Sequence, residues 1–270
     1  MPWALITGAC SGIGREIAAE LARRGYSLLL ASNRAAELEL AARQLADDQG
    51  VDTRALPLDL ARADAAAVLH QKVRALGVDV EVLVNNAGML LFGEVVEADP
   101  ACMGALLQLH VTTPSLLARY FGADMRARRS GHILFVSSAS TWCDFPGVAL
   151  YGSTKRYLRS FAASLREELA PWGVTVTCVA PGAVATGLYG QSTGAAAKAA
   201  RWGLLGDPAF VARAAVRGML RGKALVLPGM GAKLMAVGAA LTPRWLVHLV
   251  RVRTHFLSQP PARRGRSAQS

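Results

Sequence analysis

Seven short apolar segments, separated by segments of helical character, constrain the fold of this chain more than any other feature. Most of them are continuous apolar runs rather than alternating ones, which is typical of strands buried on both faces of a parallel sheet. Repeated strand–helix alternation predicts an α/β fold: a doubly wound, mostly seven-stranded parallel sheet with helices on both faces. The expected strands are Trp3–Thr7, Ser27–Ala31, Thr53–Leu58, Glu81–Asn85, His132–Ser137, Val174–Ala180 and Ala224–Leu227.

The intervening segments predict helices within a single domain over residues 1–257, because no clear linker divides the chain. Residues 188–222 fit the alternation less well. They are rich in Gly and Ala, and we expect them to cover the substrate side of a site. Residues 258–270 are expected to form a basic, flexible tail. The expected helices are Ile13–Arg24, Ala35–Asp48, Asp64–Leu76 and Tyr151–Ala170, with Ala101–Arg129 forming one long helix or two.

The chain of 270 residues is basic, with 30 Lys and Arg against 19 Asp and Glu, a net charge of +11. No zinc-finger spacing or aromatic-interleaved RNA motif accompanies this charge, so we expect no nucleic-acid partner and no metal. Scattered cysteines indicate reduced thiols in a cytoplasmic protein. The sequence contains no run of about 18 consecutive apolar residues, so it predicts no membrane-spanning helix.

The C-terminal segment, residues 229–256, combines apolar patches with Trp245, Phe256 and basic residues. One interpretation is a peripheral contact with an anionic membrane. The other is that the segment packs on the substrate side or at a subunit interface. The sequence leaves both open.

A glycine-rich turn follows the first expected strand and opens the first expected helix. Residues 7–14 read TGACSGIG, with a G-x-x-x-G-x-G spacing. Glycines permit positive φ and let the backbone approach a pyrophosphate, and the helix N-terminus favours phosphate groups. The turn therefore indicates a dinucleotide cofactor.

Together with three later motifs, this turn resembles the short-chain dehydrogenase/reductase (SDR) family. Residues 85–88 (NNAG) resemble the second motif of the family, Ser138 with residues 151–155 (YGSTK) its active site, and Pro181-Gly182 with Thr186 its nicotinamide-side motif. The resemblance covers residues 3 to about 188 and implies a Rossmann-type fold. It places the cofactor against Gly8, Cys10, Ser11, Gly12, Ile13, Gly14, Ser32, Asn33, Arg34, Asp59, Leu60, Asn86, Ala87, Gly88, Tyr151, Lys155, Pro181, Gly182, Val184 and Thr186.

The end of the second expected strand indicates which cofactor is preferred. NAD enzymes of this build place an acid there, which bonds the adenosine ribose hydroxyls. This chain instead has Ser32, Asn33 and Arg34, which can donate hydrogen bonds to a 2′-phosphate or pair with it. We therefore expect NADP(H) rather than NAD(H). Asp59 resembles the adenine contact of the family; it can also cap a helix N-terminus, and the two roles are compatible.

The expected chemistry is carbonyl reduction or the reverse. Reduction places negative charge on the carbonyl oxygen, so an acid must supply a proton there. Tyrosine can do this when a nearby cation lowers its pKa. Tyr151 and Lys155 are four residues apart, so they share a helix face. By resemblance, Tyr151 is the general acid/base, Lys155 assists it and holds the nicotinamide ribose, and Ser138 positions the substrate oxygen.

His110 departs from the pattern of the family, which has an asparagine there that helps to hold a proton-relay water. Histidine can exchange hydrogen bonds and carry a proton. We therefore count His110 among the catalytic candidates, as part of a modified relay. The alternative is a histidine that only packs its helix.

The sequence thus predicts an NADP(H)-dependent oxidoreductase acting on an apolar carbonyl or alcohol; the alternative is a nucleotide-binding sensor or scaffold with little turnover. The resemblance also implies a homodimer or homotetramer. Apolar residues of the segments expected to line the substrate side are Met89, Leu90, Leu91, Phe92, Trp142, Phe145, Leu188, Tyr189 and Trp202.

Overall fold

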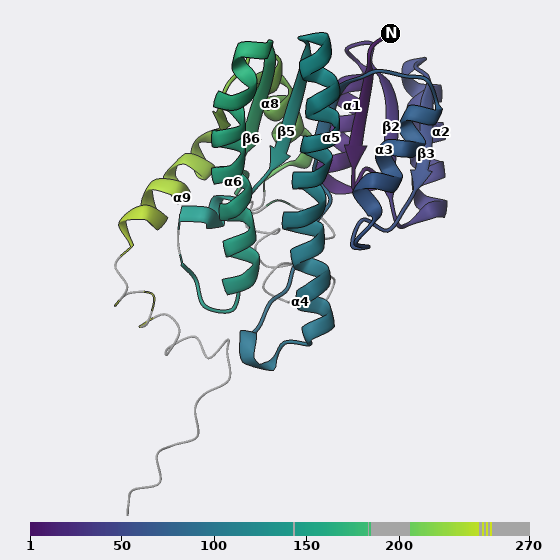
Figure 1. The fold of residues 1–270 in the computed structure, drawn as a ribbon. Helices are drawn as coiled ribbons and strands as arrows, with labels where there is room; N and C mark the ends of the chain where they lie inside the picture. Colours follow the sequence, from purple (N-terminus) through teal and green to yellow (C-terminus); the bar gives the residue numbers. More distant parts are fainter. Residues whose placement is uncertain are drawn as a thin grey trace, which may run out of the picture.

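The computed structural model describes residues 1–142, 144–182, 184, 206–242, 245, 247 and 249. Its centre is a seven-stranded sheet in the order β3-β2-β1-β4-β5-β6-β7, in which every pair is parallel (Figure 1). This confirms the predicted fold class. The strands are β1 Trp3–Thr7, β2 Ser27–Ser32, β3 Thr53–Pro57, β4 Val80–Asn85, β5 Gly131–Val136, β6 Val174–Val179 and β7 Leu225–Val226.

The continuous apolar runs are explained by burial on both sides of the sheet. In β2, Leu28 and Leu30 belong to one hydrophobic cluster, whereas Leu29 and Ala31 belong to a second cluster. Successive side chains of a strand point to opposite faces, so each face of β2 needs its own apolar residues. All six residues of β2 are buried.

Helices cover the two faces of the sheet. Side chains of α1, α2 and α8 contribute to the first cluster, and side chains of α3, α5 and α6 contribute to the second. The α-helices are α1 Gly12–Ala22, α2 Ala35–Gln49, α3 Ala65–Ala75, α4 Pro100–Leu107, α5 Thr113–Arg128, α6 Ala149–Leu169, α8 Pro208–Leu220 and α9 Gly229–Leu241. The shorter helical segments are η1 Val95–Glu97, η2 Gln108–Thr112, η3 Ala139–Trp142 and η4 Ala170–Trp172.

The long helix expected over Ala101–Arg129 is one run with an irregular turn in it. Between α4 and α5, residues 108–112 form a π-helical turn, η2. By length and composition, the run Pro100–Arg128 is apolar enough to cross a membrane. Its Leu117, Phe121 and Met125 are buried in the second cluster, so the run packs as a core helix of the sheet.

Residues 208–220 of the expected cover form α8 instead. Asp207 begins this helix, because its carboxylate accepts hydrogen bonds from the backbone N–H groups of Ala209 (2.9 Å) and Phe210 (3.2 Å). Val216 and Met219 are fully buried in the same cluster as α1. This part of the expected cover is therefore a core helix. The remainder, residues 188–205, lies outside the described residues, as does the tail 258–270.

The strand order reverses beside β1, since β2 lies on one side of it and β4 on the other. At such a switch point, the connections after the two central strands leave to opposite faces and open a crevice at the carboxyl ends of the strands. The glycine-rich turn follows β1 and the residues NNAG follow β4, so the fold brings both motifs to this crevice.

Candidate functional site

A cleft of about 620 Å³ lies at the carboxyl ends of the strands. It brings together nearly all of the predicted site residues that the structure describes. Thr186, Leu188, Tyr189 and Trp202 lie outside the described residues. The lining includes Gly8, Cys10, Ser11, Gly12, Ile13, Ser32, Asn33, Arg34, Asp59, Leu60, Asn86, Ala87, Gly88, His110, Ser138, Tyr151, Lys155, Pro181, Gly182 and Val184.

The glycine-rich turn needs its glycines for two separate reasons. Gly8 and Gly12 have φ values of 67° and 56°, which side chains rarely adopt. Gly14 has no room for a Cβ atom, because that atom would overlap the carbonyl oxygen of Gly8 and the amide nitrogen of Asn86. The turn therefore presents bare backbone to the cleft just before the N-terminus of α1.

Thr7 holds the two cofactor motifs together. Its hydroxyl donates to the carbonyl of Val84 (3.1 Å) and accepts from the N–H groups of Asn86 (3.0 Å) and Ala87 (3.1 Å). The Asn86 side chain returns the contact, since its amide nitrogen donates to the carbonyls of Thr7 (2.9 Å) and Gly8 (3.2 Å). Thr7 was not predicted as a site residue; its place at the strand end, just before the turn, was the available signal.

Arg34 links the end of β2 to the glycine-rich turn. Its guanidinium donates to the Ser11 hydroxyl (2.6 Å) and the Cys10 sulfur (2.9 Å), and it pairs with Glu37 at 2.7 Å. Half of this side chain remains exposed, at 46%. Arg34, paired with Glu37, thus lines the cleft close to the end of β2, where NAD enzymes of this build place an acid.

Asp59 lines the cleft and accepts a hydrogen bond from the Ala61 N–H (3.0 Å). It does not cap the next helix, because α3 begins at Ala65 and Asp64 occupies the preceding position. The helix-cap interpretation of Asp59 is therefore wrong, and its carboxylate stays beside the turn that follows β3.

Tyr151 and Lys155 lie on one face of α6 and both line the cleft. The Lys155 ammonium is 5.8 Å from the centre of the Tyr151 ring and donates to the carbonyl of Val136 (3.0 Å). Burial lowers the pKa of Lys155 to about 8. Ser138 follows β5 and faces the same cleft.

His110 is almost completely buried in the π-helical turn, with 1% of its surface exposed. Its Nε2 accepts from the N–H of Met89 (3.0 Å), and its Nδ1 lies 3.0 Å from the Thr154 hydroxyl. Because that hydroxyl donates to the carbonyl of Tyr151 (2.8 Å), Nδ1 carries the proton and donates to Thr154. Both ring nitrogens are therefore engaged with the protein in a neutral tautomer.

Burial, followed by the positive charge of Lys155, lowers the pKa of His110 from 6.5 to about 2. A Cβ atom on Gly88 would come within 2.9 Å of the imidazole Nε2, so the NNAG segment packs directly on the ring. His110 thus connects the residues that follow β4 with the helix that carries Tyr151 and Lys155.

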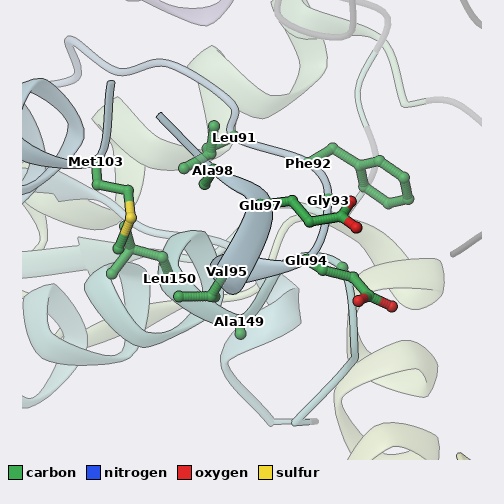
Figure 2. Close-up of a pocket in the computed structure, with 11 residues that line it drawn as sticks. Leu91, Phe92, Gly93, Glu94, Val95, Glu97, Ala98, Met103, Ala149 and Leu150 are labelled. Atoms are coloured by element: carbon green, nitrogen blue, oxygen red, sulfur yellow. The ribbon is translucent and has the colours of Figure 1, made fainter. Parts of the chain in front are cut away.

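A second pocket of about 190 Å³ lies between the segment after NNAG and the start of α6 (Figure 2). Leu91, Met103 and Leu150 give it apolar walls, and Gly93 N–H donates to the carbonyl of Gly147 (2.8 Å) to join the two segments. Of the predicted substrate-side residues, Leu91 and Phe92 line this pocket, whereas Met89 and Leu90 line the cleft.

Two other features border the substrate side. Trp142 lies under the guanidinium of Arg159, at 4.3 Å from the centre of the ring. Val184 forms a parallel β-bridge with Gly206. Val184 itself lines the cleft.

Comparison with known proteins identifies the family. Residues 2–196 match the family model for short chain dehydrogenases, so the chain belongs to the SDR family of oxidoreductases. An uncharacterized oxidoreductase of Bacillus subtilis, YmfI, is 39% identical over 194 residues, which is 70% of this chain and 78% of that protein. The very-long-chain 3-oxoacyl-CoA reductase of Aspergillus clavatus is 31% identical over 66% of this chain. That match spans 52% of the fungal protein, about half of its length.

Solved structures agree with the fold. A short-chain dehydrogenase from Sphingobium yanoikuyae in complex with NADPH has a TM-score of 0.78 and 27% identity, covering 97% of this chain and 98% of that one. A metagenomic short-chain oxidoreductase in complex with NADP has a TM-score of 0.69 and 30% identity, covering 83% and 91% of the two chains.

The buried neutral imidazole makes stability depend on pH. Unfolded His110 regains its ordinary pKa of 6.5, whereas the folded value is about 2. Between these values the unfolded chain binds a proton that the folded chain does not, so the free energy of unfolding falls as the pH drops below about 6.5. Urea unfolding of wild type and His110→Asn at pH 7.5, 6 and 5 measures this. We expect the wild type to lose about 1.4 kcal/mol more per pH unit than the variant. Equal slopes contradict the neutral assignment.

Proposed function

We propose that this protein is an NADP(H)-dependent oxidoreductase that moves a hydride between the cofactor and a carbonyl or secondary alcohol of an apolar substrate. The observation that carries the proposal is the composition of one cleft. The glycine-rich turn, Ser138, Tyr151 and Lys155 all line it, although they come from the connection after β1, the end of β5 and α6. Membership of an oxidoreductase family supports this chemistry.

The residues of the cleft fit a dinucleotide. Gly8 and Gly12 adopt positive φ, and Gly14 has no room for a side chain, so the backbone is open to a pyrophosphate at the N-terminus of α1. The lining of the cleft includes Arg34, after β2, and Pro181 and Gly182 of the nicotinamide-side motif, after β6. When bound there, a nicotinamide cofactor supplies or accepts the hydride.

The side chains of this chain manage the proton. As negative charge develops on the substrate oxygen, the Tyr151 hydroxyl donates its proton to that oxygen, and in the oxidation direction the phenolate takes the proton back. The ammonium of Lys155, 5.8 Å from the Tyr151 ring, favours the ionised phenol. The Ser138 hydroxyl holds the substrate oxygen in place. With a pKa of about 8, Lys155 stays mostly protonated at neutral pH.

The preference for NADP(H) rests on Arg34. Its guanidinium already contacts Ser11 of the glycine-rich turn, and the Ser32 hydroxyl lies 3.2 Å from the Cys10 sulfur and accepts from the backbone N–H of Arg34 (3.4 Å). A 2′-phosphate beside Ser32 and Asn33 gains a charge-assisted contact from this arginine. The nearby acid, Glu37, is held in an ion pair with Arg34. Solved relatives in complex with NADPH and NADP support the same choice.

The substrate proposed for this site is apolar and small enough to enter next to Tyr151. Met89 and Leu90 line the cleft, and in the neighbouring pocket Leu91 and Leu150 add apolar surface, although Glu94 and Glu97 line that pocket too (Figure 2). We further propose that the enzyme works in the cytoplasm as a homodimer or homotetramer.

Replacing Tyr151 with Phe removes the proton donor and little else. With NADPH and a panel of apolar ketones and aldehydes, we expect kcat to fall about a thousandfold while the cofactor Kd changes far less. Tyr157→Phe is the matched control, because Tyr157 lies on the same helix and its hydroxyl contacts Ser115 outside the cleft. Tight NADPH binding by the wild type without turnover of any substrate would favour the sensor or scaffold instead.

The cofactor preference is tested at Arg34. In Arg34→Ala, KM for NADPH is expected to rise roughly tenfold or more because a charge-assisted contact to the 2′-phosphate is lost, while KM for NADH stays nearly constant. Steady-state kinetics with both cofactors measure the two values. Arg43→Ala, on an exposed part of α2, serves as the control. If KM rises equally for NADPH and NADH, Arg34 supports the structure of the turn and does not recognise the 2′-phosphate.

His110 is proposed to position the catalytic helix rather than to carry a proton. Its Nδ1–H holds Thr154 and, through it, the carbonyl of Tyr151, while Nε2 holds Met89. We expect His110→Asn to lower kcat but to leave the pKa values of the pH–rate profile between pH 5 and 9 where they are, because wild-type His110 does not titrate in that range. If a pKa of the pH–rate profile shifts or disappears in the variant, His110 takes part in proton transfer, as the modified-relay hypothesis requires.

A further inference from the structure

One face of α9 carries a line of exposed apolar side chains, which we call the α9 stripe: Met230, Leu234, Val237 and Leu241. They are exposed to 67%, 67%, 58% and 76%. Their spacing of four, three and four residues places them along one side of a helix. Trp245 (67% exposed) and Leu249 (38%) continue the line at spacings of four residues beyond the end of α9.

The other face of α9 packs on the protein. Ala232 and Ala236 are buried, at 5% and 4% exposure, and α9 contacts η3. Figure 1 shows α9 at the side of the molecule, beyond α6 and away from the sheet. The helix is therefore docked by Ala232 and Ala236, and the residues of the α9 stripe face outward. Exposed apolar side chains gathered on one helix face mark an interaction surface.

Charge indicates which partner this surface fits. Residues 229–270 contain seven Lys and Arg and no Asp or Glu. Lys233 on α9 itself is exposed. The acids next to the elements that border α9 are paired, Asp144 with Arg156 at 2.7 Å and Asp207 with Arg213 at 3.9 Å. The α9 stripe thus belongs to a segment of the chain whose Lys and Arg residues are not balanced by any Asp or Glu.

We propose that the α9 stripe docks the protein on an anionic lipid surface, with α9 lying in the plane of the membrane interface. An apolar helix face in a segment of positive charge binds such a surface through buried apolar area and attraction to acidic headgroups. A second copy of the chain would bring another segment of the same positive charge to the stripe, which opposes self-pairing. This proposal concerns location and stands independently of the proposed reaction.

Vesicle co-sedimentation of the full-length protein tests the proposal. With vesicles of phosphatidylcholine and phosphatidylglycerol, we expect the wild type to sediment, and we expect binding to weaken when phosphatidylcholine is used alone or NaCl is raised. The Leu234→Ser, Leu241→Ser double variant loses two apolar contacts, so its affinity should fall roughly tenfold or more. Lys233→Glu should weaken binding to the anionic vesicles only.

The matched control is the Leu40→Ser, Val96→Ser double variant, which removes two exposed apolar side chains from α2 and η1. It should bind like the wild type. Circular dichroism melting checks that each variant folds, and light scattering reports the oligomeric state. No sedimentation of the wild type, or equal binding by the stripe variant, overturns the proposal. So does an oligomer that dissociates in the stripe variant while its vesicle binding persists, because a second copy then covers α9.

Discussion

The reciprocal contact between Thr7 and Asn86 is the interaction on which the rest of the site depends. Thr7 ends β1 and Asn86 directly follows β4, the two central strands at the point where the strand order reverses. Thr7 holds the backbone after β4, and Asn86 holds the backbone of the glycine-rich turn. The contact fixes the width of the crevice. It also explains why Gly14 can carry no side chain, since the Asn86 amide occupies that space.

His110 extends this rigid frame from the cofactor side to α6. The backbone N–H of Met89, after β4, donates to Nε2 of the imidazole, and Nδ1 is hydrogen-bonded to the hydroxyl of Thr154 in α6. A histidine with two engaged nitrogens bridges a longer distance than an asparagine side chain would. The bridge holds only in the neutral state, because a proton on Nε2 would remove the acceptor for Met89. The fold therefore stabilises the neutral imidazole, which the positive charge of Lys155, a few ångströms from the same NNAG segment, also favours.

The sequence predicted the sheet, the helices of both faces and the cleft because each rests on a local signal: an apolar run, a glycine spacing, or a pair of residues four apart. It did not reveal Thr7 as a link, since that contact joins residues 79 positions apart. It also misplaced residues 208–220. An Asp-Pro start, Asp207-Pro208, signals a helix N-terminus, but the Gly- and Ala-rich residues before it obscured the signal. The protonation state of His110 depends on burial, which a sequence pattern does not give.

Burial destabilises the charged form of the Lys155 ammonium, and a hydrogen bond to the protein offsets part of this loss. Moving an ammonium out of water disfavours its charge, and the pKa falls to about 8. The carbonyl of Val136 at the end of β5 accepts from the ammonium at 3.0 Å and restores part of the lost hydration. The Ser137 hydroxyl, which donates to the carbonyl of Lys155 at 2.7 Å, ties the helix to the same strand end. A cation that is desolvated but still charged acts on the Tyr151 ring with little screening by water. Burial of Lys155 thus strengthens its attraction to an ionised Tyr151, on which the proposed chemistry depends.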